Sequence, residues 1–181
     1  MWLFAYGSLM WRPGFPYQHA EPARLEGWVR RFWQGSADHR GTEAAPGRVV
    51  TLLPDPNGHC VGVAYQIDTN GLDATVRGLD VREKGGYRRE RLDVMLRSGA
   101  RLPALTYVAA PDNRNYLGPA ALDAMATQIM TAHGPSGANL DYLRLLERAV
   151  VEAGAQDVHV SLLMAAIRPR LPVGSAPRDL C

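Results

Sequence analysis

The segment Phe4-Ala5-Tyr6-Gly7-Ser8-Leu9-Met10-Trp11 sets the expected architecture. An apolar run from Met1 to Ala5 breaks abruptly at a Gly-Ser step, which is typical of a buried strand that feeds a tight turn. Glycine lets a ligand approach the main chain closely, so consecutive N–H groups in this turn can converge on an anionic or carbonyl oxygen. The same residues also fit an ordinary turn at the end of a strand.

A second segment, Leu79-Asp80-Val81-Arg82-Glu83-Lys84-Gly85-Gly86-Tyr87-Arg88, places the carboxylate of Glu83 in a basic, glycine-rich stretch. Taken alone, these residues fit a solvated cluster of ion pairs, which contributes little to stability. Phosphate binding is disfavoured, because neither segment has the Gly-x-x-x-x-Gly-Lys-Ser/Thr or Gly-x-Gly-x-x-Gly spacing. The residues alone leave open whether Glu83 is structural or catalytic.

Length and composition favour a single globular domain. The chain has 181 residues, of which 46% are hydrophobic and 21% charged, so it can bury a sizeable core. Its net charge of +2 is too small to indicate a polyanion partner, although Trp and Arg neighbours in residues 28–33 would suit nucleic-acid stacking. There is no apolar run of about 18 residues and no signal-peptide pattern. We therefore expect a soluble, cytoplasmic protein that binds neither nucleic acid nor membrane.

The sequence offers no pattern for a metal or a nucleotide cofactor. Cys60 and Cys181 form neither a metal-ligand spacing nor a disulfide framework. Ser36, Asp38 and His39 invite a catalytic-triad interpretation, but triad members converge from different elements, and no Gly-x-Ser-x-Gly elbow occurs. An Asp-His pair in a loop more often caps its own backbone. We therefore expect no metal and no cofactor.

Strand patterns dominate the first part of the chain. Residues 23–33 mix aromatic and basic positions in a way that fits one or two strands. Residues 48–53 and 60–67 are rich in valine, and the Asn57-Gly58 step between them predicts a β-hairpin. In residues 60–67, large side chains alternate with Gly62, Ala64 and Gln66, which predicts one packed face and one face with room for another group.

The remaining chain alternates between helix and strand patterns before it becomes helical. Apolar spacing predicts a short helix over residues 68–79 that ends just before Glu83. Residues 87–96 and 102–109 form a second antiparallel pair, turned at Arg97-Ser98-Gly99. The loop over residues 111–119 then holds the hydroxyl of Tyr116.

Three helices are expected at the end of the chain. They cover about residues 120–133, then residues from an Asn139 N-cap to Gly154, then a helix that begins at Asp157. The residues after Arg168 are rich in Pro, Gly and Ser and are expected to lack fixed structure. Strands first and helices last indicate an α+β fold with a mixed or barrel-like sheet.

Several ordered motifs resemble those of the ChaC family of γ-glutamylcyclotransferases, from Leu3 to about Arg168. The motifs are Tyr6–Trp11, Arg30–Ser36 with Asp38–Gly41, Gly47–Leu52, Gly62–Tyr65, Arg82–Tyr87, Asn115–Pro119 and Gly134–Gly137. The resemblance implies a γ-glutamylcyclotransferase-like fold, a small mixed β-barrel with flanking helices, as one domain over residues 1–168. Residues 169–181 match no family motif and are expected to be a flexible tail.

The resemblance also implies an enzyme that converts glutathione to 5-oxoproline and cysteinylglycine without a metal or cofactor. It assigns Glu83 as general acid and base, Tyr6, Gly7, Ser8 and Leu9 as the loop that cradles the γ-glutamyl group, and Tyr116 as a tyrosine beside the substrate. Two alternatives remain open from the sequence: a cyclotransferase acting on γ-glutamyl amino acids more broadly, and a non-catalytic module that binds γ-glutamyl compounds. The oligomeric state is not predicted.

Overall fold

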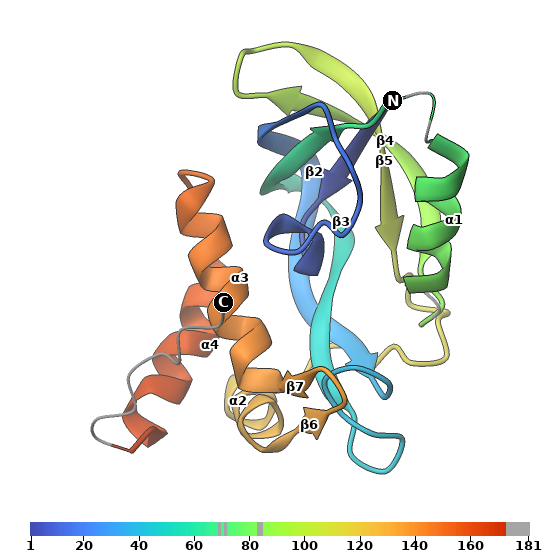
Figure 1. Ribbon diagram of the computed structural model, residues 1–181. Helices are drawn as coiled ribbons and strands as arrows, with labels where there is room; N and C mark the ends of the chain where they lie inside the picture. The colour runs from blue at the N-terminus through green and yellow to red at the C-terminus, as the bar shows by residue number, and fades with distance from the viewer. Residues whose placement is uncertain (69, 71, 83–84, 173–181) are drawn as a thin grey trace.

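The protein is a closed barrel of five strands with helices on both sides (Figure 1). A computed structural model describes residues 1–68, 70, 72–82 and 85–172. The barrel strands are β1 (Trp2–Ala5), β2 (His19–Ser36), β3 (Gly47–Gln66), β4 (Arg88–Leu96) and β5 (Arg101–Val108). Their order around the barrel is β1-β3-β2-β4-β5, and β1 closes it by pairing antiparallel with β3 and parallel with β5. The expected α+β class and mixed barrel are confirmed.

Helices cover the two sides of the barrel. Helix α1 (Leu72–Arg82) lies on one side, and α2 (Leu122–Thr131), α3 (Asn139–Glu152) and α4 (Val158–Ile167) pack together on the other (Figure 1). Short elements complete the fold. They are the 3₁₀ turns η1 (Ser8–Met10) and η3 (Arg168–Arg170) and the two-residue strands β6 (His133–Gly134) and β7 (Gly137–Ala138).

The predicted hairpin at Asn57-Gly58 is wrong, because β3 continues through this step without reversing direction. β3 pairs antiparallel with β2 on both sides of it, with His59 opposite Glu26 and Pro54 opposite Trp28. The four residues between Pro54 and His59 face only Gly27, so they form a large bulge. Gly27 has a φ of +76°, and the Asn57 N–H donates to Oδ1 of Asp55 at 3.1 Å. The turn residues therefore bend a long strand instead of ending it.

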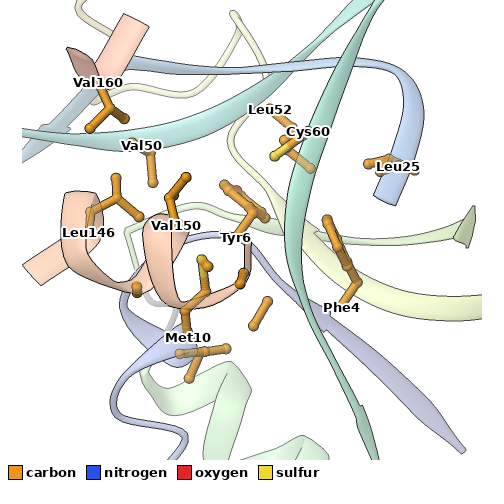
Figure 2. Close-up of a cluster of buried hydrophobic side chains, with 14 of the residues drawn as sticks. Phe4, Tyr6, Met10, Leu25, Val50, Leu52, Cys60, Leu146, Val150 and Val160 are labelled. Carbon is orange, nitrogen blue, oxygen red and sulfur yellow. The ribbon is translucent and has the colours of Figure 1, made fainter. Parts of the chain in front are cut away.

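The small residues of β3 do not leave room for another group, which corrects the expectation from the sequence. Gly62 and Ala64 are buried inside the barrel, and the larger Val61 and Val63 are only half-buried. A Cβ added at Gly62 would lie 2.9 Å from the ring of Phe4. The aromatic ring of Phe4 in β1 therefore fills the space beside Gly62. Figure 2 shows this ring among the buried side chains of the core.

Helices α3 and α4 close the core from outside the barrel. Leu146 and Val150 of α3 and Val160 of α4 point toward Val50 of β3 (Figure 2), and all four are buried. Such apolar stripes at helical spacing are the main source of helix stability in a folded domain. This side of the core lies directly behind the turn that follows β1.

Two helix starts predicted from capping residues have different outcomes. Asp157 caps α4 as predicted, since its Oδ1 accepts from the N–H groups of His159 and Val160 at 3.0 and 3.1 Å. Asn139 is not a cap, because the N-cap of α3 is Ala138. The buried Asn139 amide instead accepts from the Arg48 N–H at 2.6 Å and donates to the Arg48 carbonyl at 2.7 Å. An amide group offers a donor and an acceptor together, so it can replace a strand partner at the beginning of β3.

The end of the chain lies only partly within the described residues. Arg170 of η3 donates to Oδ1 of Asp123 and to the Thr127 hydroxyl, so residues up to 170 contact α2. Most of the predicted tail, residues 173–181, lies outside the described residues.

Candidate active site

A cavity of about 480 Å³ opens at one end of the barrel, beside the turn that follows β1. Tyr6, Gly7, Ser8 and Leu9 all line it, so four of the predicted site residues lie together in one wall. The other walls come from the end of β2 with the loop after it, from β3 and β5, and from α3. The cavity is therefore built from segments far apart in the sequence.

The turn from Tyr6 to Leu9 is held in place by its carbonyl groups. Arg30 Nε donates to the Tyr6 carbonyl at 2.8 Å, and the Tyr65 hydroxyl donates to the Leu9 carbonyl at 3.0 Å. The Gly7 and Ser8 carbonyls accept from later N–H groups of the same turn. By contrast, the N–H groups of Gly7 and Leu9 donate to no residue within the described ranges. Two backbone donors in residues of the cavity wall thus have no partner among the described residues.

Close packing limits the size of the residue at position 7. The φ of Gly7, −127°, lies in the half of conformational space open to all residues. A Cβ at this position would lie 3.1 Å from the Tyr142 hydroxyl and 3.1 Å from a methyl group of Val50. A larger residue would therefore push the turn away from β3 and α3 or narrow the cavity.

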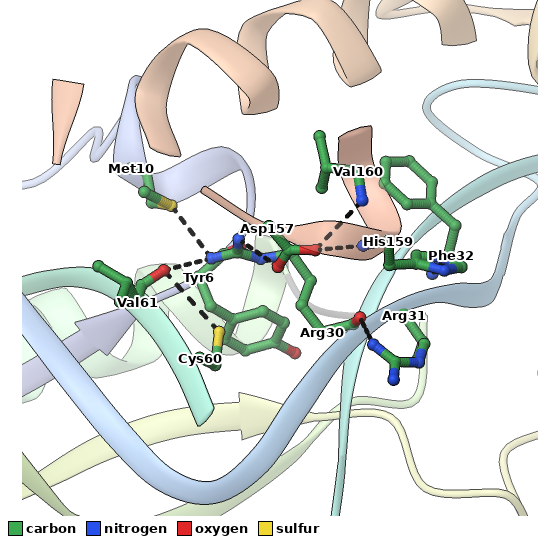
Figure 3. Close-up of polar contacts among 10 residues, drawn as sticks. All are labelled: Tyr6, Met10, Arg30, Arg31, Phe32, Cys60, Val61, Asp157, His159 and Val160. Atoms are coloured by element: carbon green, nitrogen blue, oxygen red, sulfur yellow. Dashed lines mark hydrogen bonds and ion pairs between the residues drawn. The ribbon is translucent and has the colours of Figure 1, made fainter. Parts of the chain in front are cut away.

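Arg30 connects this turn to α4 through a buried network (Figure 3). Its guanidinium is completely buried, and it donates to Oδ2 of Asp157 at 3.0 Å and to the Val61 carbonyl at 2.6 Å. Asp157 in turn caps α4. One side chain thus links the turn, β3 and the helical layer, so the turn is rigid before any ligand binds.

Tyrosine hydroxyls stabilise the cavity from several strands. Tyr6 donates to the Tyr107 carbonyl at 2.6 Å, and Tyr87 donates to the Val50 carbonyl at 2.8 Å. Burial raises the pKa of Tyr65 to about 12, and burial with a hydrogen bond to Asp80 raises the pKa of Tyr107. The Tyr65 and Tyr107 phenols therefore stay protonated at neutral pH and act as donors, as their hydrogen bonds require.

Glu83, the predicted acid and base, lies outside the described residues. The described residues on either side of it are Arg82, where α1 ends, and Gly85, which lines the cavity. The Gly85 carbonyl accepts from Asn113 Nδ2 at 2.9 Å and from Gln34 Nε2 at 3.4 Å. The backbone of Gly85 is therefore fixed at the cavity wall.

Asp80 fixes α1 against the barrel on the side of the chain that leads to Glu83. Its carboxylate accepts from Arg89 Nε at 2.8 Å and from the Tyr107 hydroxyl at 2.9 Å. The hydrogen bonds from Arg89 hold the pKa of Asp80 below its usual range. Tyr107 also lines the cavity, so the hydrogen bond from Tyr107 to Asp80 connects α1 directly to the cavity wall.

Comparison with known proteins identifies the family. The family model described as ChaC-like protein matches residues 1–170. The chain belongs to the ChaC-like protein family. Among the relatives of this ChaC-like chain, Gamma-glutamylcyclotransferase 2-3 of Arabidopsis thaliana is 46% identical and spans 93% of the chain and 88% of its own length. Glutathione-specific gamma-glutamylcyclotransferase 1 of Homo sapiens is 43% identical and spans 95% of the chain and 80% of its own length.

The ChaC-like fold also matches a solved structure. The crystal structure of a yeast γ-glutamyl cyclotransferase specific to glutathione superimposes with a TM-score of 0.88 at 31% identity. The match covers 93% of this chain and 96% of the yeast chain. The resemblance stated from the sequence motifs is thus confirmed at the level of family and fold.

Tyr116 is the one described candidate that does not line the cavity of the ChaC-like fold. It forms an isolated bridge with Gln34 on β2, and its N–H donates to the Asn113 carbonyl at 2.9 Å. Its role as a tyrosine beside the substrate remains a prediction. The tyrosines that do line the cavity besides Tyr6 are Tyr87, Tyr107 and Tyr142.

Sequence reasoning missed the functional position of Arg30. In the sequence Arg30 is one basic residue among several, but Arg30, Phe32 and Gln34 occupy alternate positions of β2 and all three are buried. Alternate residues of a strand lie on the same face. The signal in the sequence was therefore that Arg30 and Gln34, both polar, share a face with the apolar Phe32. Gln34 Oε1 is also the one buried side-chain polar atom without a partner in the described part of the chain.

The loop of Ser36, Asp38 and His39 also lines the cavity, which the sequence did not predict. The Ser36 hydroxyl accepts from the Arg40 N–H at 3.0 Å, so part of this loop does cap its own backbone. His39 Nδ1 lies 3.2 Å from the hydroxyl of Ser136, and His39 Nε2 lies 3.8 Å from the Asp38 carboxylate. Among the described residues, no group of three or more His, Cys, Asp or Glu is placed to hold a metal, and no helix is long and apolar enough to cross a membrane.

Proposed function

We propose that this protein is a glutathione-specific γ-glutamylcyclotransferase, which converts glutathione to 5-oxoproline and cysteinylglycine. The names of its relatives at 43–46% identity and of the yeast structure support this function. The structural observation that carries the proposal is the rigid turn from Tyr6 to Leu9. Its carbonyls are occupied, and the N–H groups of Gly7 and Leu9 are available beside a cavity of about 480 Å³.

The reaction needs positioning more than it needs a reactive group from the protein. The α-amine of the γ-glutamyl residue attacks its own γ-carbonyl, closes a five-membered lactam and releases cysteinylglycine. Both reacting atoms belong to one molecule, and well-oriented intramolecular reactions reach effective molarities of about 10⁵ to 10⁸ M. A cavity with a fixed wall favours the folded-back conformation of the substrate.

The backbone donors of the turn suit the charge that develops during attack. When the amine adds to the γ-carbonyl, the carbonyl oxygen gains negative charge, and fixed N–H groups stabilise such an oxyanion. We assign this role to the turn from Tyr6 to Leu9, with the N–H groups of Gly7 and Leu9 as the candidates. Because Arg30 and Tyr65 already hold the turn by its carbonyls, it needs little reorganisation when charge appears.

Glu83 is assigned as the general base and acid of the reaction. The substrate ammonium must lose a proton to become nucleophilic, and the departing amine of cysteinylglycine must gain one. One carboxylate can perform both transfers in sequence, with a contribution of about 10²- to 10⁴-fold. The position of Gly85 in the cavity wall, two residues after Glu83, supports this assignment.

The direct test is incubation of the purified protein with glutathione without added metal or nucleotide. We expect 5-oxoproline and cysteinylglycine in equal amounts. γ-Glutamylalanine under the same conditions distinguishes the broader activity, and we expect glutathione to be preferred. Absence of 5-oxoproline from both compounds would contradict the cyclotransferase function and favour a non-catalytic binding module.

A further inference from the structure

The cavity contains a positively charged side chain to which neither the family motifs nor the proposed chemistry assigns a role. The Arg40 guanidinium lines the wall formed by α3 and the loop after β2, and it is half-buried. Its Nη1 donates to the Ala138 carbonyl at 3.1 Å, and its Cζ lies 5.7 Å from the ring centroid of Tyr142. This cation–π contact and the hydrogen bond fix the guanidinium in the wall.

No carboxylate neutralises Arg40 within the described part of the chain. Arg40 takes part in no ion pair there, and Asp141 attracts it only from beyond ion-pair distance. Burial lowers the pKa of Arg40, since burial removes water from its charge. The other charged residues among the described lining of the cavity are Arg12, which is also positive, and Asp38, whose side chain is 56% exposed. A half-buried guanidinium without a counterion favours an anionic ligand.

Arg40 and the turn from Tyr6 to Leu9 both lie beside Tyr142. The Tyr142 hydroxyl is 3.1 Å from a Cβ position at Gly7, while Arg40 contacts the face of the same ring. The guanidinium is therefore one tyrosine side chain away from the proposed γ-glutamyl site. Cysteinylglycine extends two residues beyond the γ-carbonyl, which is about 7 Å when extended. A substrate bound at the turn can thus direct its terminal carboxylate toward Arg40.

We propose that Arg40 binds the glycine carboxylate of glutathione and thereby selects the tripeptide over γ-glutamyl amino acids. A guanidinium has five N–H donors, and among the described residues Arg40 uses one of them, toward Ala138, so a bidentate contact with a carboxylate remains open. This inference rests on the proposed function, since it assigns the cysteinylglycine half of the same substrate.

The test compares two substrates that differ only in the terminal charge: glutathione and its glycinamide analogue. Wild-type protein should prefer glutathione in kcat/KM by about 10- to 100-fold, as expected for hydrogen bonds to a charged group. In Arg40→Met, kcat/KM for glutathione should fall by that factor, while the value for the amide changes little. Arg40→Lys keeps the charge and should retain part of the preference.

Arg148→Met is the matched control, because Arg148 lies on α3, is 57% exposed and pairs with Glu152 away from the cavity. It should retain the full preference for glutathione. Two results would overturn the role of Arg40. The first is a wild-type kcat/KM for glutathione less than about twice that for the amide, a measurement that does not depend on the folding of any variant. The second is an equal loss of kcat/KM on both substrates in a folded Arg40→Met protein. Formation of 5-oxoproline from both compounds with equal efficiency would leave the cyclotransferase function standing, whereas its absence from both would refute function and inference together.

Discussion

Arg30 and Asp157 form an ion pair, 3.0 Å between Nη1 and Oδ2, that joins the wall of the cavity to the first turn of α4 (Figure 3). The two residues are separated by 127 positions in the sequence. Through Nε, the same guanidinium holds the Tyr6 carbonyl. The position of the proposed catalytic turn therefore depends on a helix from the other end of the chain.

Substitution of Arg30 should destabilise the protein strongly. Arg30→Met leaves the Asp157 carboxylate without its partner and the Tyr6 and Val61 carbonyls without a donor. Removal of one member of a buried ion pair costs about 3–5 kcal/mol in the free energy of unfolding. Urea denaturation measures this loss. The control is Arg24→Met on the same strand, which breaks only an exposed ion pair with Glu26 and should change the free energy of unfolding by less than about 1 kcal/mol. If both substitutions destabilise the protein equally, the structural role of Arg30 is refuted.

Glu83→Gln should remove turnover and leave the fold intact. The amide keeps the size and hydrogen bonding of the carboxylate but cannot accept the ammonium proton. We expect kcat to fall by about 100-fold or more. Release of 5-oxoproline measures the rate, and circular dichroism checks folding. Residual activity above about a tenth of the wild-type value is incompatible with a general base at this position.

Gly7→Val should impair the enzyme more than Ser8→Ala. A side chain at Gly7 meets the Tyr142 hydroxyl and Val50 at 3.1 Å, and forced packing of this kind costs about 1–3 kcal/mol. The turn is proposed to act through its backbone, so loss of the Ser8 hydroxyl should matter less. kcat/KM for glutathione compares the two variants. The reverse order would make Ser8 a direct participant in the reaction.

Chelators should have no effect on activity. The proposed mechanism uses one carboxylate and backbone N–H groups, and the sequence contains no metal-ligand spacing. Exhaustive dialysis against EDTA, followed by the 5-oxoproline assay, tests this expectation. Loss of activity that a divalent cation restores would show that a metal takes part.

Acetylation of the substrate amine should abolish turnover. N-acetylglutathione has no nucleophilic amine, so it cannot form the lactam, whereas a hydrolase would release N-acetylglutamate from it. Mass spectrometry of the products distinguishes the two reactions. Because the acetylated compound must be shown to bind, its inhibition of glutathione turnover is measured alongside. Any N-acetylglutamate that depends on Glu83 would contradict the intramolecular mechanism.

The parts of the fold that were predictable from the sequence are those set by local patterns. The strand and turn at Phe4–Met10, the turn between β4 and β5 and the Asp157 cap follow from apolar runs, glycine and capping residues. The bulge at residues 55–58 was not predictable, because an Asn-Gly step has the same local preference in a hairpin and in a bent strand. Pairing with β2 decides between them, and this pairing is a long-range property.

In the candidate site too, residues that are neighbours in sequence were predictable, and residues brought together by long-range packing were not. Residues 6–9 were predicted as site residues from a turn that is continuous in sequence and from the family resemblance, and they line one cavity in the structure. Arg40 and Tyr142 were missed, since they meet across about a hundred residues of chain and only the packing of α3 brings them into one wall. Glu83 was predicted from family resemblance and lies outside the described residues, and Tyr116 lies outside the cavity lining.

The closure of the barrel by β1 has a consequence for biosynthesis. β1 pairs with β3 and β5, and the Tyr6 hydroxyl bonds to Tyr107, 101 positions later. During translation, the segment that forms the proposed catalytic turn is therefore made long before its partners exist. Contacts of such high sequence separation slow folding, because a long loop must close before they form. The first strand can pair with β3 while β5 is still inside the ribosome, but the barrel closes, and the Tyr6 hydroxyl reaches Tyr107, only after β5 has emerged.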